Sequence, residues 1–123
     1  MKTILVVDDE EAVVEFVSSL LEDADYRVLR AYDGRSAFEL ARAEHPDLIV
    51  TDIMMPIVNG LELCRLLRAT PETRGIPLIF MTAGRSPNQH CPGARVLRKP
   101  FDLNALEEAV SCALQSSGGA KRS

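Results

Sequence analysis

Short apolar runs alternate along the chain with segments in which apolar residues recur every three or four positions. The run at 4–7, Ile-Leu-Val-Val, is apolar throughout, which is typical of a strand covered on both faces. We predict further strands at 26–31, 48–51, 78–81 and 95–98. Helical spacing predicts helices over 13–24, 36–43, 61–68 and 103–114.

This alternation predicts a parallel sheet with helices on both faces. Right-handed crossovers between about five strands leave few topologies, and the flavodoxin-like order 2-1-3-4-5 is the natural one for a small chain. With 123 residues the chain is long enough for one sizeable core but not for two. We therefore predict one doubly wound α/β domain over residues 1–115, followed by a Ser- and Gly-rich flexible tail over 116–123.

The charge and hydropathy of the chain argue against several classes of protein. The 14 basic and 18 acidic residues give a net charge of −4, which disfavours nonspecific binding to nucleic acid because that requires a basic face. No apolar run approaches the ~20 residues that span a membrane, and the N-terminus lacks the apolar stretch of a signal peptide. We expect a cytoplasmic protein without nucleic acid or membrane partners.

The three cysteines, Cys64, Cys91 and Cys112, are far apart in sequence and odd in number. They form no CxxC pair, so their spacing indicates neither a disulfide framework nor a zinc site. We expect buried or incidental thiols in a reducing compartment. His90 and Cys91 are expected to be exposed loop residues, since two adjacent ligands without others nearby make a poor metal site.

Polar residues follow the predicted strands at the points where the strands end: Asp8 and Asp9, Asp52, Thr82 and Lys99. Because the carboxyl ends of parallel strands lie along the same edge, these side chains should converge on one crevice. In the order 2-1-3-4-5 the topological switch point lies between the first and third strands. Open α/β sheets bind their ligands at such a point.

The predicted crevice combines three carboxylates with one cation. Two carboxylates about 5 Å apart repel by roughly 3 kcal/mol at an effective dielectric near 20, so three together raise proton affinities or require a cation. Oxygen ligands and room for water favour Mg²⁺. A carboxylate held beside Mg²⁺ and Lys99 can attack a phosphoryl group and form an aspartyl phosphate. The Thr82 hydroxyl can then donate a hydrogen bond to a phosphoryl oxygen.

Four motifs together resemble those of response-regulator receiver domains, and the resemblance covers about residues 2–115. The motifs are ILVVDDEE at 4–11, DLIVTDIMMPIVNG at 47–60, PLIFMT at 77–82 and KPF at 99–101. The resemblance implies that Asp52 is the phosphoacceptor. It also implies that the phosphoryl donor is a phosphohistidine on a sensor histidine kinase or a histidine phosphotransfer protein.

The resemblance further implies roles for the other residues of the crevice. Mg²⁺ would be held by the carboxylates of Asp8, Asp9 and Asp52. The backbone carbonyl of Met54 would be a further ligand. Thr82 would be the switch hydroxyl and Lys99 the partner of the phosphoryl group. A cis peptide bond between Lys99 and Pro100 would direct Lys99 into the site.

Three departures from the family pattern affect these expectations. Only 17 positions separate Thr82 from Lys99, and the segment contains two prolines and two glycines, so we predict that the family's fourth helix is absent or reduced to one turn. Val96 stands where most relatives carry Tyr or Phe, so output should depend on the Thr82 loop rather than on an aromatic rotamer. Met54 and Gly84, which flank the phosphoryl group in relatives, offer no polar group to position a water.

We expect a single-domain response regulator of a two-component or phosphorelay system, phosphorylated on Asp52 with Mg²⁺, that switches a protein partner through residues 82–98. Its only reactions would be its own phosphorylation and dephosphorylation, so it would not be an enzyme. The alternative is a pseudo-receiver that binds its partner regardless of phosphorylation. A Mg²⁺-dependent phosphohydrolase is disfavoured because its nucleophile usually follows the first strand in an Asp-x-Asp arrangement. Dimerisation is a further candidate output.

Overall fold

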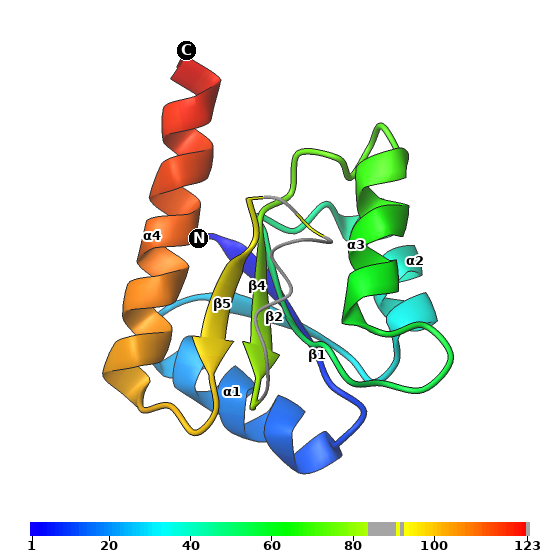
Figure 1. Ribbon diagram of the computed structural model, residues 1–123. Coiled ribbons are helices and arrows are strands. Elements are labelled where there is room, and N and C mark those ends of the chain that lie inside the picture. The colour runs from blue at the N-terminus through cyan, green and yellow to red at the C-terminus, as the bar shows by residue number, and fades with distance from the viewer. Residues whose placement is uncertain (84–90, 92, 123) are drawn as a thin grey trace.

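The computed structural model describes residues 1–83, 91 and 93–122, the last seven of them by their backbone alone. These residues form five strands and four helices (Figure 1). The strands are β1 (Thr3–Val7), β2 (Arg27–Ala31), β3 (Leu48–Asp52), β4 (Leu78–Thr82) and β5 (Arg95–Arg98). The helices are α1 (Glu11–Asp23), α2 (Gly34–Glu44), α3 (Gly60–Ala69) and α4 (Leu103–Arg122).

The strands lie in the order β2-β1-β3-β4-β5, and every neighbouring pair is parallel, as the sequence predicts. Alternate residues of β1 face opposite sides of the sheet. Leu5 and Val7 pack in one hydrophobic cluster with α2 and α3, whereas Ile4 and Val6 pack in a second cluster with α1 and α4. Figure 1 shows α2 and α3 together on one side of the sheet. Both faces are covered, which explains why the first apolar run has no polar position.

Side-chain caps determine where three of the helices begin. Asn59 and Glu62 form a capping box at α3: the Asn59 side chain accepts the Glu62 N–H at 2.9 Å, and the Glu62 side chain accepts the Asn59 N–H at 3.1 Å. The Asp33 side chain accepts the Ser36 N–H at 2.7 Å at the start of α2. Asp102 accepts the Ala105 N–H at 2.8 Å in the first turn of α4.

Two glycines allow the turns beside the carboxyl edge of the sheet to approach each other closely. A Cβ atom on Gly60 would collide with the backbone oxygen of Asp52, and one on Gly34 would collide with the backbone oxygen of Val58. The Gly60 N–H also donates to the Ile53 carbonyl at 2.8 Å. The loop from β3 to α3 therefore folds back tightly onto the end of β3.

The last helix is longer than the sequence predicts, since α4 continues to Arg122, past the expected domain end at Gln115. Extending an existing helix is far less costly than starting one, so the helix can continue past Leu114, which packs against the hydrophobic cluster beneath α4. A flexible tail over 116–123 stays a prediction. The expected loss of the family's fourth helix concerns mainly residues 84–90 and 92, which lie outside the described residues. No helix of the described chain is both long and apolar enough to cross a membrane.

Cys64 and Cys91 are joined by a disulfide bond, so the expectation of unpaired thiols is wrong for these two residues. Their Cα atoms are 6.3 Å apart, within the usual range for disulfides. Both side chains are buried, so Cys91 is not the exposed loop residue that the sequence suggested, and His90 lies outside the described residues. The error arose because spacing along the chain does not report that α3 and the segment before β5 share one hydrophobic cluster. Cys112 is half-buried and has a free thiol.

Candidate functional site

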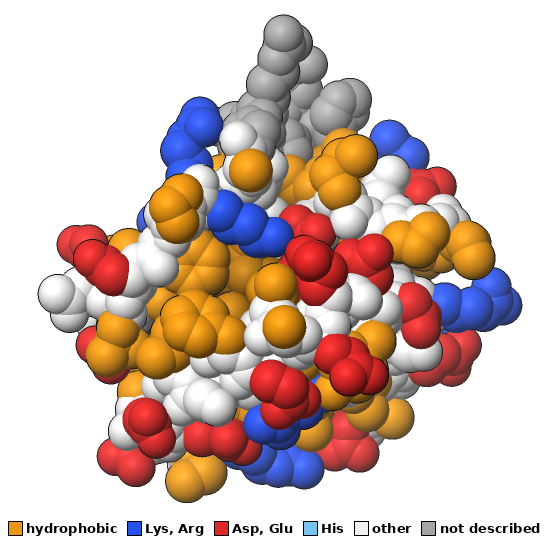
Figure 2. All heavy atoms as spheres, turned by 90° about the horizontal axis from the view of Figure 1, so that it is seen from below, with side chains coloured by type: hydrophobic (Ala, Val, Ile, Leu, Met, Phe, Trp, Pro, Cys, Tyr) orange, Lys and Arg blue, Asp and Glu red, His pale blue; other side chains and the backbone are white. Residues whose placement is uncertain are grey.

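The polar residues at the ends of the central strands meet at one edge of the sheet. Asp8 and Asp9 directly follow β1, Asp52 ends β3 and Thr82 ends β4. The pairing register keeps these carboxyl ends level with one another. Carboxylate oxygens of Asp8, Asp9 and Asp52 all lie within 4.8 Å of one another. Figure 2 views this edge of the molecule and shows acidic side chains gathered beside a basic one.

Asp8 is the most buried member of the cluster, with no exposed surface. Its Oδ1 accepts the Glu10 N–H at 2.9 Å, whereas no donor among the described residues forms a hydrogen bond with Oδ2. The pKa of Asp8 is raised to about 6, mainly by burial and also by the charge of Asp52, while the Glu10 N–H and Lys99 act in the opposite direction. The negative charge of Asp8 is therefore only partly compensated by the protein.

Lys99 supplies the positive charge of the site. Its Nζ lies 3.3 Å from Oδ1 of Asp52 and 3.5 Å from Oδ2 of Asp8, the latter as an ion pair rather than a hydrogen bond. Burial lowers the pKa of Lys99, but the two carboxylates outweigh burial and the net pKa is raised. The peptide bond between Lys99 and Pro100 is cis, as the resemblance implied.

Thr82 and Asp52 are both largely buried at their strand ends. The Thr82 carbonyl accepts the Lys99 N–H at 2.9 Å, which connects the end of β4 to the residue that follows β5. Met54 lies in the loop after β3 with its side chain exposed. Asp9 is exposed as well. The structure thus brings together all of the carboxylates and the lysine that the sequence predicted.

Sequence reasoning gave no role to the backbone groups that hold these side chains in place. The Glu10 N–H fixes one oxygen of Asp8, and Gly60 lets the loop after β3 pack against Asp52. The available signal was the position of Gly60 immediately after the capping residue Asn59. A glycine at the first position of a helix, beside a buried strand end, indicates close approach of two backbones.

Comparison with known sequences places the chain in a family. Residues 4–111 match the sequence model of the response regulator receiver domain. The chain belongs to this family. Members are signalling modules of two-component systems that are phosphorylated on aspartate and bind Mg²⁺ in an acidic pocket. We call the cluster of Asp8, Asp9 and Asp52 at the carboxyl edge of this chain the receiver site.

Curated relatives of this receiver domain include longer regulators. The chain is 41% identical over 108 residues to the response regulator MprA of Mycolicibacterium vanbaalenii, which covers 84% of this chain and 46% of the relative. It is 36% identical over 121 residues to the alkaline phosphatase synthesis transcriptional regulatory protein PhoP of Bacillus subtilis, covering 94% of this chain and 50% of the relative. The chain thus spans about half the length of these relatives.

Solved structures similar to this receiver domain include both isolated regulators and parts of kinases. The chemotaxis protein CheY4 of Vibrio cholerae superposes with a TM-score of 0.87 at 30% identity, covering 93% of this chain and 99% of that one. The receiver domain of the sensor histidine kinase PA1611 from Pseudomonas aeruginosa superposes with a TM-score of 0.83 at 26% identity, covering 93% and 98%. That structure has a magnesium ion coordinated in its active-site cleft.

The residues of this receiver domain fit a Mg²⁺ ion. The donor set consists of carboxylate oxygens, which are the hard ligands that Mg²⁺ prefers. Oδ2 of Asp8 is buried and has no hydrogen-bond donor among the described residues, so a cation would satisfy it. The pKa of Asp8, which is raised mainly by burial, would fall on metal binding.

Proposed function

We propose that this receiver domain accepts a phosphoryl group on Asp52 while Asp8, Asp9, Asp52 and the backbone carbonyl of Met54 hold Mg²⁺. The observation that carries the proposal is the meeting of three carboxylates within 4.8 Å, with the Lys99 ammonium 3.3 Å from Asp52. Such a cluster suits the binding of a divalent cation together with a phosphoryl group.

The transfer step forms one bond and breaks one. A carboxylate oxygen of Asp52 attacks the phosphorus of a phosphohistidine, an O–P bond forms, and the P–N bond breaks. The histidine ring nitrogen keeps the electron pair of the broken bond. Because Asp52 ends a central strand and Gly60 holds the following loop against it, the nucleophile is fixed in position before the donor arrives.

Charged and polar neighbours stabilise the phosphoryl group during and after transfer. Mg²⁺, when bound, offsets negative charge on the transferring oxygens. The Lys99 ammonium, paired with Asp52 before transfer, is free to pair with a phosphoryl oxygen afterwards. The Thr82 hydroxyl, at the adjacent strand end, donates a hydrogen bond to another oxygen.

The phosphoryl donor is a sensor histidine kinase or a histidine phosphotransfer protein, and the system is cytoplasmic. Phosphorylation adds about −1.5 to −2 charges beside Lys99. The Thr82 carbonyl and the Lys99 N–H are hydrogen-bonded, so a change at either residue is transmitted to both ends of the segment between them. We propose that residues 82–98 switch a protein partner in this way, and that the domain's reactions are limited to its own phosphorylation and dephosphorylation.

Intact-mass measurement with a small acyl-phosphate donor tests the proposal. The wild type should gain one phosphoryl group only with Mg²⁺, and Asp52→Ala should gain none. Glu39→Ala, which removes an exposed carboxylate on α2, is the matched control and should behave like the wild type. A gain in Asp52→Ala equal to that of the wild type would refute the assignment of Asp52.

A pseudo-receiver that acts without phosphorylation is the second candidate, and Val96 is the observation that favours it. Val96 lies on β5 in register with Phe80 of β4, at the position where most relatives carry an aromatic ring. Valine cannot make the inward ring movement that accompanies phosphorylation in such relatives. If Val96→Tyr greatly enlarges the phosphorylation-dependent NMR shifts around Thr82, the missing ring limits the response. A folded wild type that binds Mg²⁺ yet accepts no phosphoryl group from its cognate kinase would favour the pseudo-receiver.

A further inference from the structure

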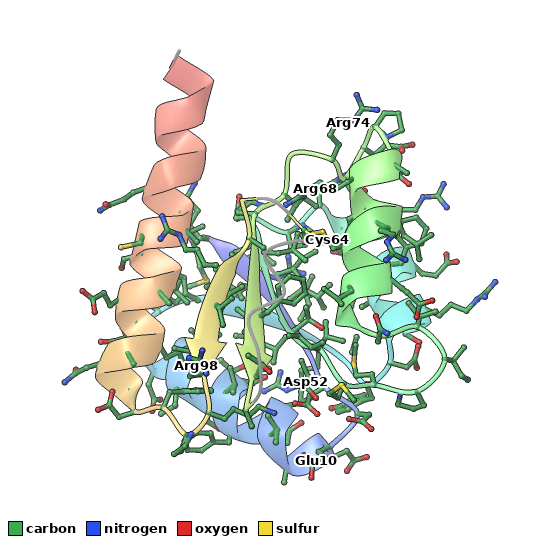
Figure 3. The ribbon with its side chains drawn as sticks, viewed as in Figure 1. Glu10, Asp52, Cys64, Arg68, Arg74 and Arg98 are labelled. Atoms are coloured by element: carbon green, nitrogen blue, oxygen red, sulfur yellow. A yellow bond between two sulfur atoms is a disulfide. The ribbon has the colours of Figure 1, made fainter. Side chains whose placement is uncertain are left out.

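The disulfide between Cys64 and Cys91 joins two elements that flank the receiver site. Cys64 lies on α3, the helix that follows the Asp52 loop, and Figure 3 shows it between that helix and the sheet. Cys91 lies between β4, which ends in Thr82, and β5. The bond spans 27 positions of sequence. The bond therefore links Cys91, which lies between β4 and β5, to α3, which follows the Asp52 loop.

Packing, and not only the bond, holds the two sulfur-bearing side chains together. Both cysteines belong to the hydrophobic cluster on the α2–α3 side of the sheet and are 1% exposed. Leu63 and Leu67 of α3 and Phe80 of β4 are buried in the same cluster. Since these contacts do not depend on the bond, the reduced cysteines would stay close enough to pair again.

The surroundings of the two cysteines differ in how readily a small molecule reaches them. Cys64 is held in the middle of a regular helix whose buried side faces the sheet. Cys91 lies outside the helices and strands, two residues before the exposed Gly93, and the space where a Cβ atom of Gly93 would lie is empty to 4 Å. Exposing Cys64 requires α3 to open, whereas Cys91 belongs to none of the described helices and strands, so local opening should expose Cys91 first.

We propose that Cys64 and Cys91 are a thiol–disulfide exchange site for low-molecular-weight disulfides of the glutathione class. A disulfide in a protein of a reducing compartment is usually transient, and a cytoplasmic receiver domain would meet such conditions. The cysteine pair lies beside the site of the proposed function, but its thiol chemistry depends only on the two cysteines and their surroundings.

The exchange has two balanced steps. The Cys91 thiolate attacks one sulfur of the small disulfide, forms a mixed disulfide and releases one small thiolate. The Cys64 thiolate then attacks the Cys91 sulfur and releases the second small thiolate. The two protons from the cysteines pass to the released thiolates, so two cysteine thiols are oxidised and one small disulfide is reduced to two thiols.

Oxidation of the pair changes how firmly Cys91 is held to α3. With the bond formed, Cys91 is held to α3 by a covalent bond as well as by packing. With the bond open, only packing holds Cys91. The redox state of the pair would thus set how far a change at Thr82 extends toward β5, a consequence that rests on the proposed function.

Counting alkylatable thiols tests the exchange site without reference to phosphorylation. Reduced wild type should take up three alkyl groups after denaturation, one for each cysteine. After native treatment with oxidised glutathione it should take up one, on Cys112, and peptide mapping should pair Cys64 with Cys91. Three alkyl groups after that treatment, or a pairing that includes Cys112, would overturn the proposal.

Three variants separate the roles of the cysteines. Cys112→Ser keeps the pair and should fall from two alkylatable thiols to none on oxidation. Cys64→Ser should accumulate a glutathione adduct on Cys91, because the resolving thiol is missing. Native Cys91→Ser should leave Cys64 unmodified, and an adduct on Cys64 formed as fast as the adduct on Cys91 would contradict the assigned order of attack.

Discussion

At the carboxyl edge of the sheet, Asp8, Asp52 and Lys99 are brought together by strand ends, whereas on the α3 side Cys64 and Cys91 are brought together by side-chain packing. The first group is polar and holds its charges in an arrangement that the protein alone does not fully compensate. The second group is apolar in its surroundings and is closed by a covalent bond.

The two regions therefore support different kinds of chemistry. Uncompensated carboxylates are stabilised when a cation binds, whereas a phosphoryl group adds negative charge, so either event changes the electrostatics of the site. A buried cysteine pair is not stabilised by the charge of a ligand. Its redox state depends on the available oxidant or reductant. If both proposals hold, one region responds to phosphoryl donors and the other to thiol redox conditions.

Opening the cysteine pair should have the largest effect on stability. Reduction of the disulfide in the Cys112→Ser variant is expected to lower the free energy of unfolding by about 3–4 kcal/mol, because the bond closes a loop in the unfolded chain. Denaturant titrations of the oxidised and reduced forms measure this difference. Equal unfolding midpoints would mean that the bond adds no constraint beyond packing.

Removing the Asp8 charge should change stability in the opposite direction. The pKa of Asp8 is raised from 3.8 to about 6, so the folded state binds this proton more tightly than the unfolded state. In metal-free buffer the free energy of unfolding should therefore fall as the pH rises from about 4 to about 6. Asp8→Asn should be more stable than the wild type at pH 7 by at most about 3 kcal/mol, and by less where water screens the charge.

Mg²⁺ provides the control for this prediction. Saturating Mg²⁺ at about 100 times its dissociation constant should stabilise the wild type by about 2.7 kcal/mol, and Asp8→Asn by much less. The two proteins are compared by thermal unfolding at several pH values, with and without the ion. A metal-free Asp8→Asn no more stable than the wild type at pH 7 would contradict the account of Asp8.

Filling the space at Gly60 should have a smaller effect that is confined to the edge. A Cβ atom there collides with the backbone of Asp52, so Gly60→Ala should cost about 1–3 kcal/mol and weaken Mg²⁺ binding. Gly75→Ala is the matched control, because nothing lies within 4 Å of the added carbon, and it should stay within about 0.5 kcal/mol of the wild type. Similar losses of stability for both variants would show that the close approach at Gly60 is unimportant.

The sequence predicted the sheet order and the edge residues because both follow from local patterns. Strand ends are visible as the points where apolar runs stop, and parallel strands place those points along one edge, so Asp8 and Asp52 were found without coordinates. The disulfide was missed because the approach of Cys64 to Cys91 depends on how α3 packs on β4. The extension of α4 was missed because the apolar spacing that indicates this helix ends at Leu114.

Locating the phosphoryl group on the chain is the most direct test of the central claim. After Mg²⁺-dependent reaction with an acyl-phosphate donor, borohydride reduces an aspartyl phosphate to homoserine, which peptide mass mapping detects. The account predicts homoserine at position 52 and unchanged aspartates at positions 8 and 9. Homoserine at either of those positions, with Asp52 unmodified, would contradict the assignment of the receiver site.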